Sequence, residues 1–165
     1  MSVISSTKNP EALSFTLVAE FEAGVERVWE LWADPRQLER WWGPPTWPAT
    51  FEKLDLVPGG KANYYMTGPD GTKAHGWWEF THVESPARLA FDDGFADEDG
   101  NPTGDMGITR ATVTLEPLGD RTRMTVQSTF ESEEQMEQMV QMGMQEGMTE
   151  AMGQIDAILA EHANA

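Results

Sequence analysis

The sequence predicts an α+β fold, in which an antiparallel sheet of about six to seven strands wraps around one long C-terminal helix. Two observations lead to this class. Several strand-like segments follow one another with only short turns between them, a pattern typical of antiparallel pairing. Helical spacing of apolar residues dominates only the last part of the chain, from about residue 132 to residue 162. A single long helix beside many strands favours a sheet that curves around that helix.

The N-terminal part alternates between strand and helix signals. Residues 1–12 are polar and are expected to form a flexible lead-in. Apolar residues then alternate from Leu13 to Glu22, which predicts a half-buried strand. From Val25 the apolar spacing becomes helical and ends at Asp34-Pro35, and a second short helix is expected from Arg36 to Trp42 before Gly43-Pro44.

The middle of the chain contains the remaining strands. Proline- and glycine-containing turns separate them, which favours hairpin connections. An acidic, glycine-containing loop is expected from about Asp93 to Gly107, and its acidic residues lie in the stretch Asp92–Asp105. Residues 13–165 are expected to form one domain, with no internal repeat. The predicted strands are Thr50–Leu56, Lys61–Thr67, Lys73–Val83, Arg88–Asp92, Ile108–Glu116 and Arg121–Phe130.

The C-terminal helix is predicted to begin at Ser132, whose hydroxyl is suited to cap it. Its inward face carries apolar residues at three- and four-residue spacing. Three glycines within it, at 143, 147 and 153, each cost about 1 kcal/mol relative to alanine. These glycines are therefore expected where the helix backbone packs closely against another part of the protein or leaves space beside the helix. The apolar face comprises Met144, Met148, Ala151, Ile155, Ile158 and Leu159.

Charge and composition exclude several classes of protein. The net charge is −17, from 28 acidic and 11 basic residues, so binding to nucleic acid or to an anionic membrane is not expected. The chain has no cysteine and no apolar run long enough to span a membrane. Its N-terminus lacks the features of a signal peptide, and a cytoplasmic protein is predicted.

No metal, cofactor or catalytic motif is evident. The three histidines lack metal-ligand spacing, and the acidic run Asp97–Asn101 has proline where a calcium loop needs glycine. No catalytic triad, phosphate-binding glycine loop or dinucleotide fingerprint is visible. We therefore predict no cofactor, no metal and no catalytic residue.

Motifs in a fixed order resemble a known family. They are Val28–Pro35 running into Leu38–Pro44, then Asp55–Gly60, and then His75-Gly76 on a strand followed by Glu84–Phe91. The chain resembles the helix-grip proteins of the START-like or Bet v 1-like superfamily. Within it, the sequence is similar to the group named for the C-terminal domain of the activator of Hsp90 ATPase, AHSA1. Relatives commonly carry Gly-Trp in the last helix, where this chain has Gly147-Met148.

The resemblance implies a helix-grip fold, with a cavity between the sheet and the C-terminal helix. Aromatic and methionine side chains would give that cavity an apolar lining. Trp29 and Trp32 are instead expected to fill the core. The candidate ligand-binding residues are Trp42, Trp47, Phe51, Tyr65, His75, Trp78, Phe80, Phe91, Met144 and Met148.

Three functions are compatible with this cavity. The first hypothesis is a non-catalytic protein that encloses a small hydrophobic molecule, as relatives that confer tolerance to toxic compounds do. In that case Trp78→Ala should weaken binding without unfolding the chain. The second is an Hsp90-related or other protein-interaction module, in which the acidic helix face would bind a basic partner, and homodimers are plausible. The third is a cyclase or aromatase for polyketide-like substrates, with Glu52, Tyr65 and His75 as candidates; an acid/base pair inside the cavity would favour it.

Overall fold

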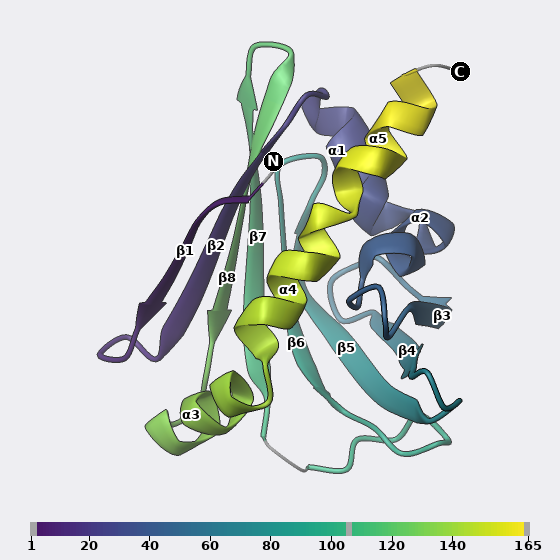
Figure 1. Ribbon diagram of the computed structural model, residues 1–165, viewed down its shortest axis with the longest axis vertical. Coiled ribbons are helices and arrows are strands. Elements are labelled where there is room, and N and C mark those ends of the chain that lie inside the picture. The colour runs from purple at the N-terminus through teal and green to yellow at the C-terminus, as the bar shows by residue number, and fades with distance from the viewer. Residues whose placement is uncertain (1–2, 105–106, 164–165) are drawn as a thin grey trace.

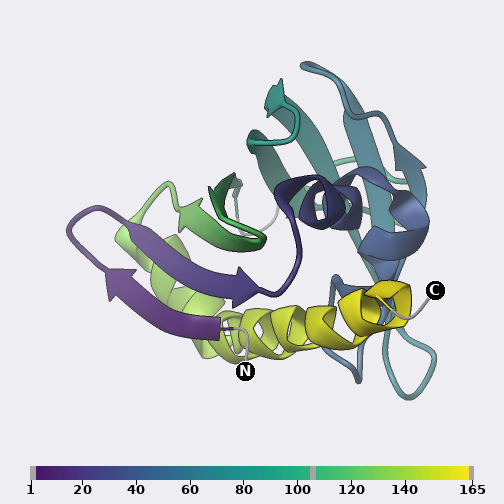
Figure 2. The same cartoon turned by 90° about the horizontal axis from the view of Figure 1, so that it is seen from above.

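The computed structural model describes residues 3–104 and 107–163, and its dominant feature is one eight-stranded antiparallel sheet with the strand order β1-β2-β8-β7-β6-β5-β4-β3 (Figure 1). Viewed from above, the sheet curves around the C-terminal helices (Figure 2). The α+β class and the curved antiparallel sheet are confirmed. The strands are β1 (Val3–Asn9), β2 (Ser14–Phe21), β3 (Ala49–Leu54), β4 (Lys61–Thr67), β5 (Lys73–Glu84), β6 (Arg88–Phe95), β7 (Thr109–Leu118) and β8 (Arg121–Thr129).

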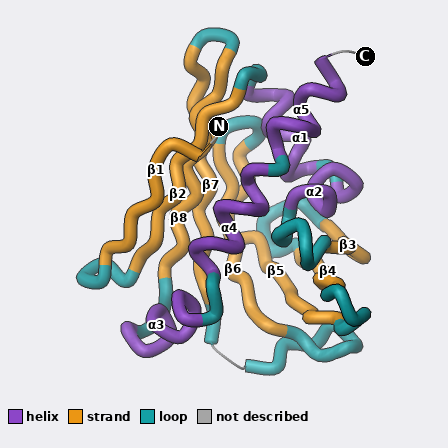
Figure 3. The backbone as a smooth tube through the Cα atoms, in the orientation of Figure 1, coloured by secondary structure: helices purple, strands orange, loops and turns teal. Residues whose placement is uncertain are grey.

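Two short helices follow β2, as predicted. They are α1 (Val25–Ala33) and α2 (Pro35–Trp41), and Asp34 separates them. The Asp34 side chain accepts a hydrogen bond from the backbone N–H of Arg36 at 2.9 Å, which caps α2. Both helices pack on the concave side of the sheet, as do the C-terminal helices (Figures 2 and 3).

The C-terminal helix is confirmed, but it does not run unbroken from Ser132: a turn at Gly143 and the single residue Gln154 divide it into three helices. These are α3 (Glu133–Gln141), α4 (Met144–Gly153) and α5 (Ile155–Ala163). Ser132 caps α3 as expected, by accepting a hydrogen bond from the backbone N–H of Gln135 at 3.0 Å. The chain then turns at Gly143, whose φ of +86° is a left-handed conformation that favours glycine. Apolar spacing continues across this turn, so periodicity alone did not reveal it.

The segment predicted as a flexible lead-in instead contains an edge strand. Strand β1 pairs antiparallel with β2, for example Thr7 with Thr16, which brings the strand count to eight. Residues 5–10 are exposed and mostly polar, so the segment lacks the apolar alternation by which a strand is recognised. Backbone pairing holds it in place, together with a hydrogen bond from the Gln145 side-chain amide to the Ser6 hydroxyl at 2.8 Å.

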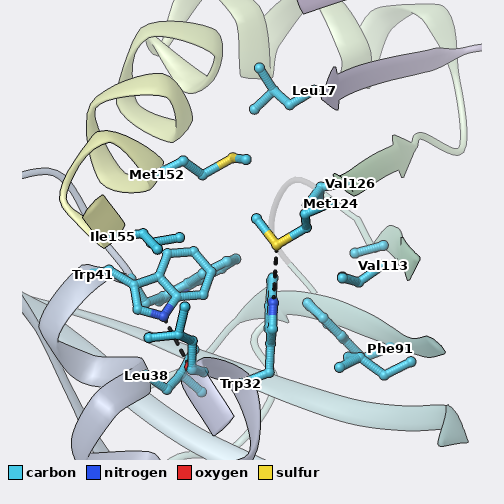
Figure 4. Close-up of a cluster of buried hydrophobic side chains, with 14 of the residues drawn as sticks. Leu17, Trp32, Leu38, Trp41, Phe91, Val113, Met124, Val126, Met152 and Ile155 are labelled. Atoms are coloured by element: carbon cyan, nitrogen blue, oxygen red, sulfur yellow. Dashed lines mark hydrogen bonds between the residues drawn. The ribbon is translucent and has the colours of Figure 1, made fainter. Parts of the chain in front are cut away.

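The core is rich in aromatic rings, and Trp32 lies near its centre (Figure 4). Its indole N–H points to the sulfur of Met124 at 3.3 Å, and its ring meets that of Trp41 edge to face at 4.7 Å between centroids. Trp29 and Trp32 are buried in this core, as predicted. Of the helices within residues 3–104 and 107–163, none has the length and apolar character needed to cross a membrane.

Candidate functional site

A cavity of about 240 Å³ lies between the concave face of the sheet and helices α3 and α4. Strands β4 to β8 contribute one side of it, the two helices contribute another, and the loop after α2 closes an end. Most of the lining is carbon. The lining residues are Trp42, Gly43, Pro44, Tyr64, Met66, Ala74, His75, Phe91, Asp93, Gly94, Phe95, Thr109, Ala111, Val126, Ser128, Met139, Met144, Gly147, Met148 and Ala151.

Strand pairing places a tyrosine and an aspartate together at one end of this cavity. Tyr64 of β4 pairs with Gly76 of β5, and Trp78, two residues further along β5, pairs with Asp93 of β6. Since side chains alternate along a strand, these positions all belong to the concave face. The Tyr64 hydroxyl donates a hydrogen bond to Oδ1 of Asp93 at 3.0 Å.

Gly76 is the residue that lets Tyr64 reach Asp93. A Cβ at position 76 would lie 2.4 Å from Cζ and 2.5 Å from the hydroxyl oxygen of Tyr64. The ring therefore lies directly over the backbone of β5, in space that any other residue would occupy. This contact gives the His75-Gly76 motif a structural reason.

Asp93 sits in an environment that disfavours its charged form. Burial raises the pKa of its carboxyl from 3.8 to about 7, although the Tyr64 hydroxyl and the Trp78 indole partly oppose this rise. Burial, followed by the nearby Asp93 charge, holds the pKa of Tyr64 well above its usual value. Asp93 is half-buried and lines the cavity, so its accessible surface faces that space. Among the described residues, no lysine, arginine or histidine forms an ion pair with it.

Two buried indole groups surround the same polar end. The N–H groups of Trp42 and Trp78 make no hydrogen bond with any described residue. Both lie close enough to the Tyr64 hydroxyl to lower its pKa, and Trp78 has the same effect on Asp93. The cavity thus combines apolar walls with one end where the Asp93 carboxyl and the Tyr64 phenol lie, and the Trp42 and Trp78 indole groups are buried beside this end.

Half of the candidate residues predicted from the sequence line this cavity. They are Trp42, His75, Phe91, Met144 and Met148. His75 reaches the lining although its ring packs beside that of Tyr65, with centroids 5.5 Å apart. That these residues bind a ligand stays a prediction.

The other five candidates lie outside the lining. Phe51, Trp78 and Phe80 are almost completely buried and fill the core behind the cavity. The Trp47 ring packs over Gly68, while Tyr65 lies beneath the ammonium group of Lys73, 4.5 Å from its ring centroid. Tyr65 is adjacent to Tyr64 and therefore belongs to the opposite face of β4. Glu52, named with Tyr65 and His75 for catalysis, is exposed and also outside the lining.

Sequence reasoning missed the two polar residues of the site. The sequence pattern predicts that Asp93 belongs to the acidic loop, whereas β6 continues to Phe95. Tyr64 was passed over in favour of its neighbour, because choosing between adjacent tyrosines requires the pairing register with Gly76. Alternation puts Trp78 and Gly76 on one face of β5, but the sequence does not show which of the two tyrosines lies opposite Gly76. Within residues 3–104 and 107–163, no cluster of three or more potential ligands could hold a metal ion.

Comparisons with known proteins agree with this architecture. The chain is similar to a protein from Arthrobacter aurescens solved by NMR, with 68% identity, 97% of this chain and 93% of that chain covered, and a TM-score of 0.93. It is also similar to a Mycobacterium smegmatis protein with 44% identity, coverage of 97% and 99%, and a TM-score of 0.89. A Silicibacter pomeroyi protein shares the fold at 22% identity, with coverage of 90% and 99% and a TM-score of 0.73.

A comparison with curated protein sequences gave no match. The family model described as "Activator of Hsp90 ATPase homolog 1-like protein" matches residues 22–160, which include every strand of the sheet except β1 and β2. The family resemblance read from the sequence motifs is confirmed. The chain therefore belongs to the family of activator of Hsp90 ATPase homolog 1-like proteins.

Proposed function

We propose that this protein binds a small, mainly apolar molecule in the cavity between its sheet and helices α3 and α4. The observation that carries the proposal is a cavity of about 240 Å³ with apolar walls and a single polar end. Ligand sites in proteins commonly have this combination, in which apolar burial supplies affinity and a few polar groups fix orientation. A sequestering role toward a toxic compound, expected from the family resemblance, would use such a site.

The expected affinity is modest. Burial of about 200 Å² of apolar ligand surface contributes roughly 5 kcal/mol, which corresponds to a sub-millimolar dissociation constant. Flexible methionine thioethers at positions 66, 139, 144 and 148 line the cavity and adapt to ligands of different shape. A naphthalene ring is a suitable probe because it is flat, apolar and fluorescent.

Filling the cavity from helix α4 should weaken binding while stabilising the fold. Gly147 lines the cavity, and a Cβ there meets no heavy atom within 4 Å. Gly147→Leu should therefore project into the cavity and weaken the binding of 2-(2-naphthyl)ethanol at least tenfold, measured by calorimetric titration. Because leucine is the better helix former by about 0.8 kcal/mol, the melting temperature should rise by about 2–3 °C.

The matched control is Gly153→Leu. Gly153 ends the same helix, is exposed, and also has open space around its Cβ position, but it does not line the cavity. This variant should bind the probe as the wild type does. The proposed site would be contradicted if the Gly147→Leu variant bound the probe as tightly as the wild type, or if the wild type did not bind it.

The Tyr64–Asp93 pair supports a second candidate function, proton transfer on a bound substrate. A carboxyl with a pKa of about 7 in an apolar cavity is suited to general acid–base catalysis. With 2-acetylnaphthalene in D₂O, the Asp93 carboxylate would take a methyl proton to form the enolate, exchange that proton for a deuteron with the solvent, and return the deuteron to the methyl carbon. Proton NMR should then show methyl exchange at least tenfold faster than in buffer, and the acceleration should be lost in Asp93→Asn. Exchange at the buffer rate would refute this candidate.

A further inference from the structure

We infer that the polar end of this cavity recognises the protonated amine of an otherwise apolar ligand. The inference rests on the proposed function, since it concerns a molecule held in the same cavity. It adds the chemical class of the ligand: an amphiphilic amine, with an aromatic or aliphatic body against the methionines and its ammonium group at Asp93.

The Asp93 carboxyl has acceptor capacity that the protein leaves unused. One of its oxygens accepts the Tyr64 hydroxyl at 3.0 Å and the Trp78 indole lies nearby, but no lysine, arginine or histidine among the described residues pairs with the carboxyl. Its neighbour Asp92, by contrast, pairs with Arg110 at 3.0 Å on the opposite face of the strand. Buried carboxylates are normally paired with a cation, so an ammonium group is the partner that Asp93 lacks.

Aromatic rings adjoin this carboxyl. Trp42, Tyr64 and Phe91 all line the cavity, and the Trp42 ring centroid lies 6.3 Å from that of Tyr64 and 6.4 Å from that of Phe91. Aromatic faces attract cations through their quadrupole, and do so more strongly where water is excluded. A carboxylate beside several rings therefore favours an ammonium ion over a neutral or an anionic group.

The charges around the cavity also favour a cationic ligand. The described residues that line it include no lysine and no arginine, and Asp93 is their one acidic member. The groups that face Asp93 are Tyr64 from β4, Trp78 from β5 and Thr109 from β7, while the helices present methionines. The His75 ring instead packs beside Tyr65, which belongs to the opposite face of β4. The sequence carries a net charge of −17, with no Lys or Arg after Arg123. The resulting field attracts cationic ligands and repels anionic ones.

Amine binding should depend on pH in a defined direction. Below a pH of about 7 the Asp93 carboxyl is protonated and offers the ammonium group no charge; above it, the carboxylate is present. An aliphatic amine, with a pKa near 10, remains protonated throughout this range. Affinity for the amine should therefore rise between pH 6 and pH 8, whereas affinity for a neutral analogue should stay level.

The test compares three probes that share one apolar body: 2-(2-naphthyl)ethylamine, 2-(2-naphthyl)ethanol and 2-naphthylacetic acid. Calorimetric titrations at pH 8 and pH 6 would use the full chain, the Asp93→Asn variant and the matched Asp92→Asn variant. Both variants remove one negative charge, one residue apart, but only position 93 lines the cavity. The comparison thus separates a contact with the amine from the overall field of the protein.

At pH 8 the wild type should bind the amine at least tenfold more tightly than the alcohol, and the acid most weakly. Asp93→Asn should weaken amine binding by about 10–100-fold, the value of a charge-assisted hydrogen bond. Asp92→Asn should change it less than threefold. Equal affinity for amine and alcohol, or tightest binding of the acid, would overturn the amine inference and leave the cavity proposal standing. Absence of binding for all three probes would overturn both.

Discussion

Replacing Trp78 with alanine should lower the free energy of unfolding by about 3–5 kcal/mol, because it would remove the centre of the aromatic core. Trp78 has no exposed surface. Its ring stacks on that of Phe91 with 4.1 Å between centroids and meets the Trp42 ring edge to face at 4.9 Å. Urea denaturation, followed by fluorescence, measures the change directly. The cavity left behind would also disturb the Trp42 and Phe91 walls of the site.

This expectation replaces the one drawn from the sequence, in which Trp78→Ala weakened binding without unfolding the chain. The matched control is Trp77→Ala, on the same strand and the opposite face, where the half-exposed ring packs over Gly94. Trp77→Ala should lower the free energy of unfolding by about 1 kcal/mol, since much of the ring already contacts water. If the two variants were equally stable, the central role assigned to Trp78 would be wrong.

Replacing Gly76 with valine should lower the free energy of unfolding by about 2–3 kcal/mol, although valine usually favours a strand. A Cβ at this position would overlap the Tyr64 ring, at 2.4 Å from Cζ, so the ring has to leave its place. The hydrogen bond from Tyr64 to Asp93 would then break, and the polar end of the cavity would open. Thermal unfolding should show a melting temperature lower by about 5–10 °C.

Gly94→Ala serves as the control for this substitution. A Cβ there would lie 2.6 Å from the indole nitrogen of Trp77, a comparable overlap. Trp77 is half-exposed and can rotate toward solvent, whereas Tyr64 is enclosed, so Gly94→Ala should cost less than half as much. A harmless Gly76→Val variant would mean that Tyr64 has room to move and is not held on Asp93.

The sequence was sufficient to predict most of the fold, because turn residues and alternation carry that information locally. The two short helices after β2 and the antiparallel sheet follow from such patterns. Strand β1 could not be predicted, since an exposed polar edge strand buries little and depends on backbone pairing with β2. The turn at Gly143 could not be predicted either, because apolar spacing continues across it while only the backbone changes direction.

The candidate site was predicted less completely than the fold. Wall residues such as Met144 and Met148 could be named from the helical face alone. The polar end depends on contacts between β4, β5 and β6, and a shift of one residue in register would exchange Tyr64 for Tyr65. Asp93 likewise became recognisable only when β6 extended beyond the predicted strand end at Asp92.

The central claim, that the cavity holds a small apolar ligand, is tested most directly by NMR of methionine methyl groups. Met66, Met139, Met144 and Met148 line the cavity, whereas Met142 is 62% exposed and Met124 lies in the core. Titration with 2-(2-naphthyl)ethanol should shift the four cavity methyl signals together, with a common dissociation constant, because the ring current of naphthalene acts over a short range. Unchanged cavity signals, or shifts confined to Met142, would contradict the account.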